Sequence, residues 1–390
     1  MAQRRATRRR SPLKLDTLRP IAPHSLPRPL DLLCTCLSAA QQGQTLDAAS
    51  AAALVDPASD LVGLARLAGR HCVTPILAAC ATDPELRQRL PEDFSLYLEF
   101  VHSENSRRNR ALRLQLKQAA GCLNEIGIEP LLLKGAVRLV DGLYRDPGWR
   151  FMRDLDLLVR RDRLSDAVAR LASVGYRFTS DAASWPEQHK HLPPLGRDGE
   201  AAVIEIHADL ISERQELCPA EQALARSRLV DLDGTRVRIP DAVDQLAQLI
   251  GHDRFDGYLR RSGMFLLRSV FEAALLCRDE ASVRKLLARA AGTDLARCVR
   301  VRLGLAAHLF PDYVGFLDAS PSERLQVRAL TAMERFDANG RWRRLVWFAR
   351  LRVGKLLTSR AAREHLAANI LSLDYRQRGA ARLRRLWTSH

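Results

Sequence analysis

Two aspartates separated by a single residue open a short apolar run, Asp-Leu-Asp-Leu-Leu-Val at 154–159. Residues i and i+2 of a β-strand point to the same face, so a strand here would set the carboxylates of Asp154 and Asp156 side by side. Two ionised carboxylates so close repel each other, and a divalent cation removes the repulsion. Mg²⁺ is typically held by one or two carboxylates together with substrate phosphates. The pair therefore favours metal-assisted displacement at phosphorus; the alternative is that Asp154 caps the strand and Asp156 is exposed.

A Lys-Gly pair, Lys134 and Gly135, follows another short apolar run at the point where a strand is expected to turn into a helix. A glycine there lets backbone N–H groups approach a phosphate, and the N-terminus of the following helix favours an anion. Lys134 is one of only six lysines, beside 55 arginines. We expect both residues to bind phosphate; the alternative is a solvated cation and an ordinary turn glycine.

A third group of polar residues interrupts the apolar run Val-Ile-Glu-Ile-His at 203–207. In a strand, Glu205 and His207 would share one face, and Ile204 and Ile206 the other. Glu205 could be a third metal-binding carboxylate, suited to orienting an acceptor or taking its proton. His207 could contact phosphate or anchor Glu205. The alternatives are a charge on an edge strand and a hydrogen-bonded core histidine.

The hydrophobic pattern indicates which elements carry these residues. Apolar residues recur at helical spacing from 29 to 126, most clearly over 106–126, where Gly127 is the expected C-cap. Strands are expected at 129–133, 154–159, 175–178, 201–210 and 235–240. Alternation of strands and helices over 127–240 predicts an α/β or α+β domain. Helical patterns resume over 241–340 and, with strong basic character, over 341–390.

The composition is that of a globular protein, with 47% apolar and 27% charged residues. No apolar run approaches the ~18 residues that span a bilayer, and the arginine-rich start lacks the apolar region of an export signal. Eight cysteines occur without Cys-x-x-Cys spacing, which is typical of core thiols in a reducing compartment. We therefore expect a cytoplasmic protein without transmembrane segments.

The net charge of +16 is concentrated at the two ends. Residues 1–14 hold six basic and no acidic residues, and 341–390 hold thirteen basic and two acidic ones. Residues 1–28, basic and with four prolines, are expected to be a disordered tail. The aromatic and basic pattern after residue 340 would suit contact with nucleic acid or an anionic surface. The alternative is a helix docked on the core, with its arginines in solvent.

The stretch from Leu131 to Phe178 resembles the signature block of the uncharacterised nucleotidyltransferase family, within the DNA polymerase β nucleotidyltransferase superfamily. The resemblance rests on Leu-Lys-Gly at 133–135, on Tyr-x-x-Pro-Gly-x-Arg at 144–150 and on Asp-x-Asp-Leu-Leu-Val at 154–159. A later Glu-x-His strand matches at 205–207. Two positions depart from the usual pattern: Ala136 stands where the superfamily has serine or glycine, and Arg153 where a small residue is usual.

The resemblance implies an α+β fold, in which a mixed β-sheet domain at 127–240 is flanked by helical regions at 29–126 and 241–340. It also implies two Mg²⁺ ions and transfer of a nucleoside monophosphate from an NTP to an acceptor. Asp154, Asp156 and Glu205 would be the catalytic and metal-binding residues. Lys134, Gly135, Arg150 and His207 would bind substrate; for Arg150 the alternative is an ion pair with a neighbouring aspartate.

The acceptor stays open between a small molecule, a peptide and an RNA end. Two other functions are compatible with the same residues. One is a non-catalytic relative that keeps the fold and binds a nucleotide or a partner protein; Ala136 and Arg153 favour it. The other is a tRNA-modifying or other RNA-modifying transferase that docks its substrate through the basic ends.

Overall fold

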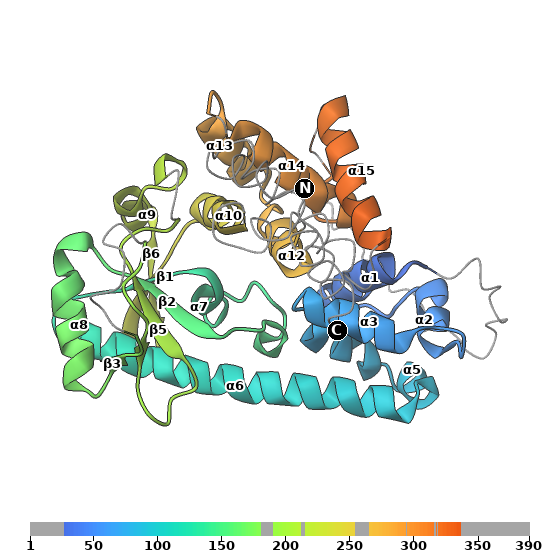
Figure 1. Cartoon of the computed structure of the whole chain (residues 1–390), viewed down its shortest axis with the longest axis horizontal. Coiled ribbons are helices and arrows are strands. Elements are labelled where there is room, and N and C mark those ends of the chain that lie inside the picture. The colour runs from blue at the N-terminus through green and yellow to red at the C-terminus, as the bar shows by residue number, and fades with distance from the viewer. Residues whose placement is uncertain are drawn as a thin grey trace, which may run out of the picture. The chain divides into compact units, whose positions relative to one another are not determined.

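A computed structural model of the chain describes residues 27–180, 190–211, 215–253, 265–293, 295–315, 317 and 319–336 (Figure 1). The expected tail at 1–28, except its last two residues, and the whole basic segment 341–390 lie outside these ranges. The chain divides into two compact units. The first comprises Met1–Gln115 and Arg138–Arg153, and the second Leu116–Val137 and Asp154–His390. The finer division expected from the sequence stays a prediction.

The first unit is helical in its described part. Its helices are α1 (Pro29–Gln42), α2 (Ala48–Val55), α3 (Leu61–Arg70), α4 (Thr74–Leu77), α5 (Pro84–Arg89) and the first part of α6 (Glu92–Asn124). Short 3₁₀ turns lie at Ala78–Thr82 and Pro147–Trp149. Helix α1 packs against α2, α3 and α4, and its Leu33, Cys36 and Leu37 are fully buried. Burial of each such leucine contributes about 1.5–3 kcal/mol.

Aspartates begin helices in both units. In each case the carboxylate accepts a hydrogen bond from a backbone N–H of the first turn, which otherwise has no acceptor. The capping residues are Asp47 for α2, Asp60 for α3, Asp83 for α5, Asp241 for α10 and Asp279 for α13.

Helix α6 covers the helix expected at 106–126 except its last two residues, and it starts earlier, at Glu92. Its apolar stripe is buried, with Leu112, Leu116 and Leu123 at 0% exposure. The helix ends before Gly127, which has a left-handed backbone (φ +73°) and donates to the carbonyl of Asn124. Gly127 therefore lies just past the helix end, where a left-handed residue satisfies the last carbonyls.

The second unit contains a seven-stranded mixed sheet in the order β3-β4-β5-β2-β1-β7-β6. Its strands are β1 (Leu131–Leu132), β2 (Asp154–Leu158), β3 (Arg177–Phe178), β4 (Leu195–Gly196), β5 (Val203–His207), β6 (Arg228–Leu232) and β7 (Thr235–Ile239). Strands β2 and β5 run parallel, as do β1 and β7, whereas the other neighbouring pairs are antiparallel. This arrangement confirms the expected α+β class with a mixed sheet.

Helices complete the second unit. They are the end of α6, α7 (Lys134–Arg138, whose last residue belongs to the first unit), α8 (Leu164–Ser173), α9 (Ala220–Arg226), α10 (Ala242–Gly251), α12 (Leu267–Leu276), α13 (Glu280–Ala290), α14 (Ala296–Leu309) and α15 (Pro321–Phe336). Helix α10 packs against α12 and α13, and α14 packs against α12, α13 and α15. Among the described residues, no helix is both long and apolar enough to cross a membrane.

Candidate active site

Strands β2 and β5 pair in parallel at the centre of the sheet (Figure 1), and their register brings the predicted carboxylates together. Asp156 is paired with Glu205, and Asp154 with Val203. Paired residues of neighbouring strands share a face, so Asp154, Asp156 and Glu205 project from the same side. The opposite side is apolar: Leu155, Leu157, Ile204 and Ile206 are all at 0% exposure. The alternating pattern therefore holds both strands against the core while the carboxylates face away from it.

Lys134 reaches into this group of carboxylates from the turn between β1 and α7. Its Nζ lies 2.5 Å from Asp156 Oδ1 and 3.9 Å from Glu205 Oε2. The Lys134 backbone is left-handed (φ +48°), which is unusual for a residue with a side chain. Burial lowers the pKa of Lys134, but Asp156 and Glu205 outweigh it and raise the pKa above its usual value, so the ammonium is charged.

His207 binds the same oxygen of Asp156 from the next strand. Its Nε2 lies 2.8 Å from Asp156 Oδ1 and 3.5 Å from Glu205 Oε2, and the side chain is at 0% exposure. Burial would raise the pKa of Asp156, but the Lys134 ammonium and the hydrogen bond from His207 hold it well below the usual range. Burial likewise opposes ionisation of Glu205, yet the contact with His207 lowers its pKa. Both carboxylates are therefore ionised at neutral pH.

The donor set suits a metal ion. Asp156, Glu205 and His207 each offer one ligand atom, and the three atoms lie within 4.8 Å of one another. Two carboxylates favour a hard cation such as Mg²⁺ or Mn²⁺, and the imidazole widens the choice of transition metals. Asp154 is outside this group of three; it is half-buried at the start of β2, on the same face as Asp156.

The two residues that depart from the family pattern, Ala136 and Arg153, differ in burial. Ala136 is fully buried at the start of α7, where its backbone N–H donates to the carbonyl of Leu133. A serine hydroxyl there would need a buried partner, and alanine needs none. Arg153 is exposed.

Arg150 lies in the first unit, within the loop Tyr144–Arg150. It is 6% exposed, and its guanidinium donates to the carbonyl of Phe151. Two buried asparagines of α6 hold the loop: Asn105 donates to the carbonyls of Gly148 and Arg150, and Asn109 to those of Pro147 and Arg150. A phosphate-binding role for Arg150 stays a prediction.

Two residues at the carboxylate cluster were not foreseen. His191 Nε2 lies 3.6 Å from Glu205 Oε2, and its ring centroid is 4.9 Å from that of His207. The Oε1 oxygen of Gln248, on α10, accepts from the backbone N–H of Lys134 at 3.2 Å. The sequence His-Lys-His at 189–191 offered a weak signal for the first. Gln248 lies inside an amphipathic helix, where the sequence gives no signal for a contact with Lys134.

Comparison with known families decides the class of this site. A family model described as an uncharacterised nucleotidyltransferase matches residues 57–311, about two thirds of the chain. The chain belongs to this nucleotidyltransferase family. The match spans Lys134, both aspartates of β2 and the Glu-x-His strand, as the resemblance in the sequence had indicated. The protein is accordingly a transferase of the nucleotidyltransferase class. No curated protein and no solved structure matches this chain.

Proposed function

We propose that this nucleotidyltransferase moves a nucleoside monophosphate from an NTP to an acceptor hydroxyl or phosphate in an Mg²⁺-dependent reaction. The observation that supports this best is the register of Asp156 and Glu205 on parallel strands, with the Lys134 ammonium between them. Asp154, Asp156 and Glu205 are the proposed ligands of two Mg²⁺ ions. When bound, such ions neutralise phosphate oxygens and stabilise the charge that develops during displacement at phosphorus.

The chain's own groups take the remaining roles. Lys134 is a charged donor that would hold the triphosphate, and Gly135 leaves room for backbone N–H groups to approach it. Glu205 would orient the acceptor or take its proton as the acceptor oxygen bonds to the α-phosphorus and pyrophosphate leaves. His207 keeps Asp156 oriented and ionised. Arg150 is the proposed additional phosphate ligand.

The acceptor chemistry is proposed in three forms: a small molecule, a peptide or an RNA end. The charge at the ends of the chain favours RNA in particular, because residues 1–14 and 341–390 carry the basic excess of the whole protein. Phosphate contacts made by these ends would weaken steeply with salt. Retention of tRNA that falls with salt and disappears when both segments are deleted would support an RNA acceptor; salt-independent retention would exclude this mode.

The test of the proposed function is thermal stabilisation by each of the four NTPs, with and without Mg²⁺. A ligand that binds only the folded state raises stability by mass action, so no acceptor is needed. We expect an Mg²⁺-dependent rise in Tm with at least one NTP, absent from the Asp154→Asn/Asp156→Asn double variant. Stabilisation by NTP without Mg²⁺, unchanged in the double variant, would favour a non-catalytic nucleotide-binding relative. No rise with any NTP would contradict the proposal.

A further inference from the structure

Gln248 connects two segments of the carboxylate site from a helix outside the sheet. Its side chain is 3% exposed. The Oε1 oxygen accepts from the Lys134 backbone N–H at 3.2 Å, and Nε2 makes a longer contact of 3.5 Å with the carbonyl of Leu210. Lys134 opens α7, and Leu210 follows the Glu205–His207 strand. One amide thus joins the two segments that bring Lys134 and Glu205 together.

The Lys134 backbone needs such a partner. The first N–H groups of a helix have no intrahelical acceptor, and Lys134 is the first residue of α7. A left-handed backbone is unfavourable for a residue with a side chain, so the surroundings must hold Lys134 in this conformation. The hydrogen bond to Gln248 satisfies the N–H in this left-handed conformation, from which the side chain enters the carboxylate group.

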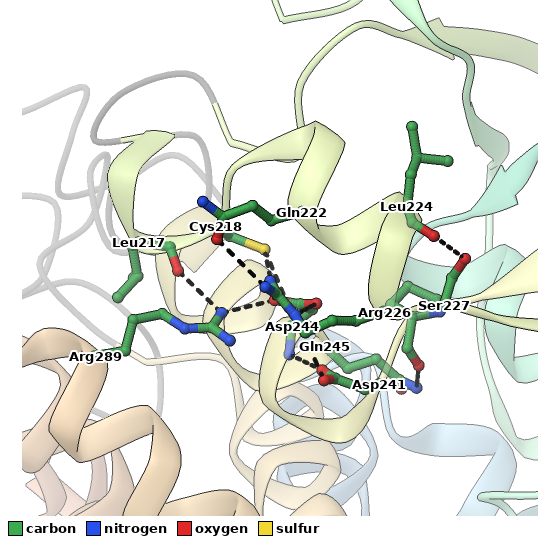
Figure 2. A network of polar contacts seen from close by, with 11 residues as sticks. Leu217, Cys218, Gln222, Leu224, Arg226, Ser227, Asp241, Asp244, Gln245 and Arg289 are labelled. Carbon is green, nitrogen blue, oxygen red and sulfur yellow. Dashed lines mark hydrogen bonds and ion pairs between the residues drawn. The ribbon is translucent and has the colours of Figure 1, made fainter.

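Hydrogen bonds to neighbouring helices hold α10, the helix that carries Gln248, in position. One turn before Gln248, Asp244 is at 0% exposure and accepts hydrogen bonds from Arg226 of α9 and Arg289 of α13 (Figure 2). Arg289 also donates to the carbonyl of Leu217. The carboxylate of Asp241 caps the start of the same helix. These contacts tie α10 to its neighbours, so Gln248 has little freedom to follow Lys134 if the turn moves.

We propose that Gln248 is a positioning residue that sets the left-handed turn at Lys134 and thereby directs its ammonium to Asp156 and Glu205. The proposed benefit to NTP binding rests on the proposed function, whereas the effect on Lys134 itself does not. Residues that orient a binding group without touching the ligand commonly change affinity by about 10–100-fold when removed.

Three substitutions separate positioning from packing. Gln248→Leu keeps the volume and removes both hydrogen bonds. Gln248→Glu keeps a carboxyl oxygen as the acceptor for the Lys134 N–H. The matched control is Gln245→Leu, on the same helix, which removes a hydrogen bond to the carbonyl of Pro240 and has no hydrogen bond with Lys134. All three are compared with wild type in Tm.

The first readout is the nitrogen NMR spectrum of protein labelled only in lysine, which contains six backbone amide and six ammonium groups. The Lys134 signals are identified by Lys134→Arg. In wild type we expect a slowly exchanging Lys134 ammonium, because its side chain is 18% exposed and bonded to Asp156. In Gln248→Leu we expect the amide to shift and the ammonium signal to be lost to exchange with water. Gln248→Glu and Gln245→Leu should resemble wild type.

The second readout is the affinity for each Mg²⁺–NTP, from the dose dependence of Tm. We expect at least about tenfold weaker binding in Gln248→Leu, with wild-type affinity in Gln245→Leu and rescue in Gln248→Glu. An unchanged Lys134 spectrum in Gln248→Leu, or failure of Gln248→Glu to restore it, would overturn the proposal. If the spectra change as expected while no protein, wild type included, binds an NTP, the positioning role stands and the proposed function fails.

Discussion

The ammonium of Lys134 lies 2.5 Å from Asp156 Oδ1, inside the group of side chains whose donor atoms suit a metal ion. The chain thus supplies its own cation to neutralise carboxylates that a divalent ion would also neutralise. Two cations cannot share one oxygen at short range without repulsion. A metal ion at this site would therefore compete with Lys134 for Asp156, and a triphosphate that attracts Lys134 would free the carboxylate for metal.

Replacing Lys134 should separate metal binding from nucleotide binding. In Lys134→Met we expect Mn²⁺, measured by calorimetry without nucleotide, to bind at least about tenfold more tightly, a gain of ~1.4 kcal/mol. Affinity for Mg²⁺–NTP should fall, because the triphosphate loses its cation. Lys285→Met, at an exposed position of α13, is the control and should change neither value. Equal Mn²⁺ affinity in Lys134→Met and wild type would contradict competition.

The two aspartates of β2 should differ in how much each contributes to the free energy of unfolding. Asp156 is 1% exposed and pairs with Lys134 and His207, so Asp156→Asn leaves buried partners unpaired. We expect about 3–5 kcal/mol loss in the free energy of unfolding, by urea denaturation.

Asp154→Asn, at a half-buried position, should cost less of that free energy than Asp156→Asn and still abolish the Mg²⁺-dependent rise in Tm with NTP. The exposed Asp162→Asn controls for loss of charge and should keep the rise in Tm. A normal rise in Asp154→Asn would remove Asp154 from the metal site.

The Asp244 network predicts a pH-dependent stability. Burial raises the pKa of Asp244, but hydrogen bonds from Arg226 and Arg289 outweigh it and lower the pKa below the usual value. A lowered folded-state pKa contributes stability that is present above the unfolded value of about 3.9 and is lost as pH falls through the folded value. Asp244→Asn should therefore cost about 3 kcal/mol at pH 7, and the difference from wild type should shrink below about pH 4.

Urea denaturation of both proteins across this pH range measures the effect. Asp198→Asn, at an exposed position, serves as the control and should track wild type at each pH. A gap between Asp244→Asn and wild type that stays constant from pH 7 to pH 3 would show that the carboxylate charge contributes nothing.

The loop Tyr144–Arg150 should depend on the asparagines of α6. Asn109→Leu removes the donor to the carbonyls of Pro147 and Arg150 at a position that is 3% exposed. The carbonyl of Arg150 keeps Asn105 as a donor, whereas the carbonyl of Pro147 loses this one. Leaving a buried carbonyl without a donor costs about 1–3 kcal/mol, so we expect a loss of about 1–3 kcal/mol in urea denaturation. Ser103→Ala, at an exposed position of the same helix, should lose little; equal losses in both variants would assign the effect to the helix instead.

Much of the sheet was predictable because its strands follow simple rules. Alternation in Asp-Leu-Asp-Leu-Leu and Val-Ile-Glu-Ile-His fixed the strand assignment and the face of each carboxylate, and the structure has both as expected. Strand β6 was missed, although Asp233-Gly234 between two apolar runs is a hairpin signal. Strand β4 has only two residues, too few for any period to appear.

The site was less predictable than the strands that carry it. Spacing could place Asp156 beside Asp154, but the pairing of Asp156 with Glu205 depends on the register of strands nearly fifty residues apart. The contacts of His191 and Gln248 depend on loop and helix packing that leaves no period in the sequence. The helix expected after the Lys-Gly pair is short, because α7 ends at Arg138. Leu139, beyond its end, is still buried, so a loop residue also contributes to the apolar core.

The backbone of Lys134 narrows the mutations that this position can tolerate. Glycine would adopt φ +48° without strain but would remove the ammonium, and asparagine would accept the conformation but could not reach Asp156. Arginine would keep the charge but carries a larger planar head, which is not equivalent at a site of this size. A scan of all substitutions at residue 134 should therefore find no neutral replacement. A change there would persist only together with a second change that reshapes the turn, so the position is expected to evolve in coupled steps.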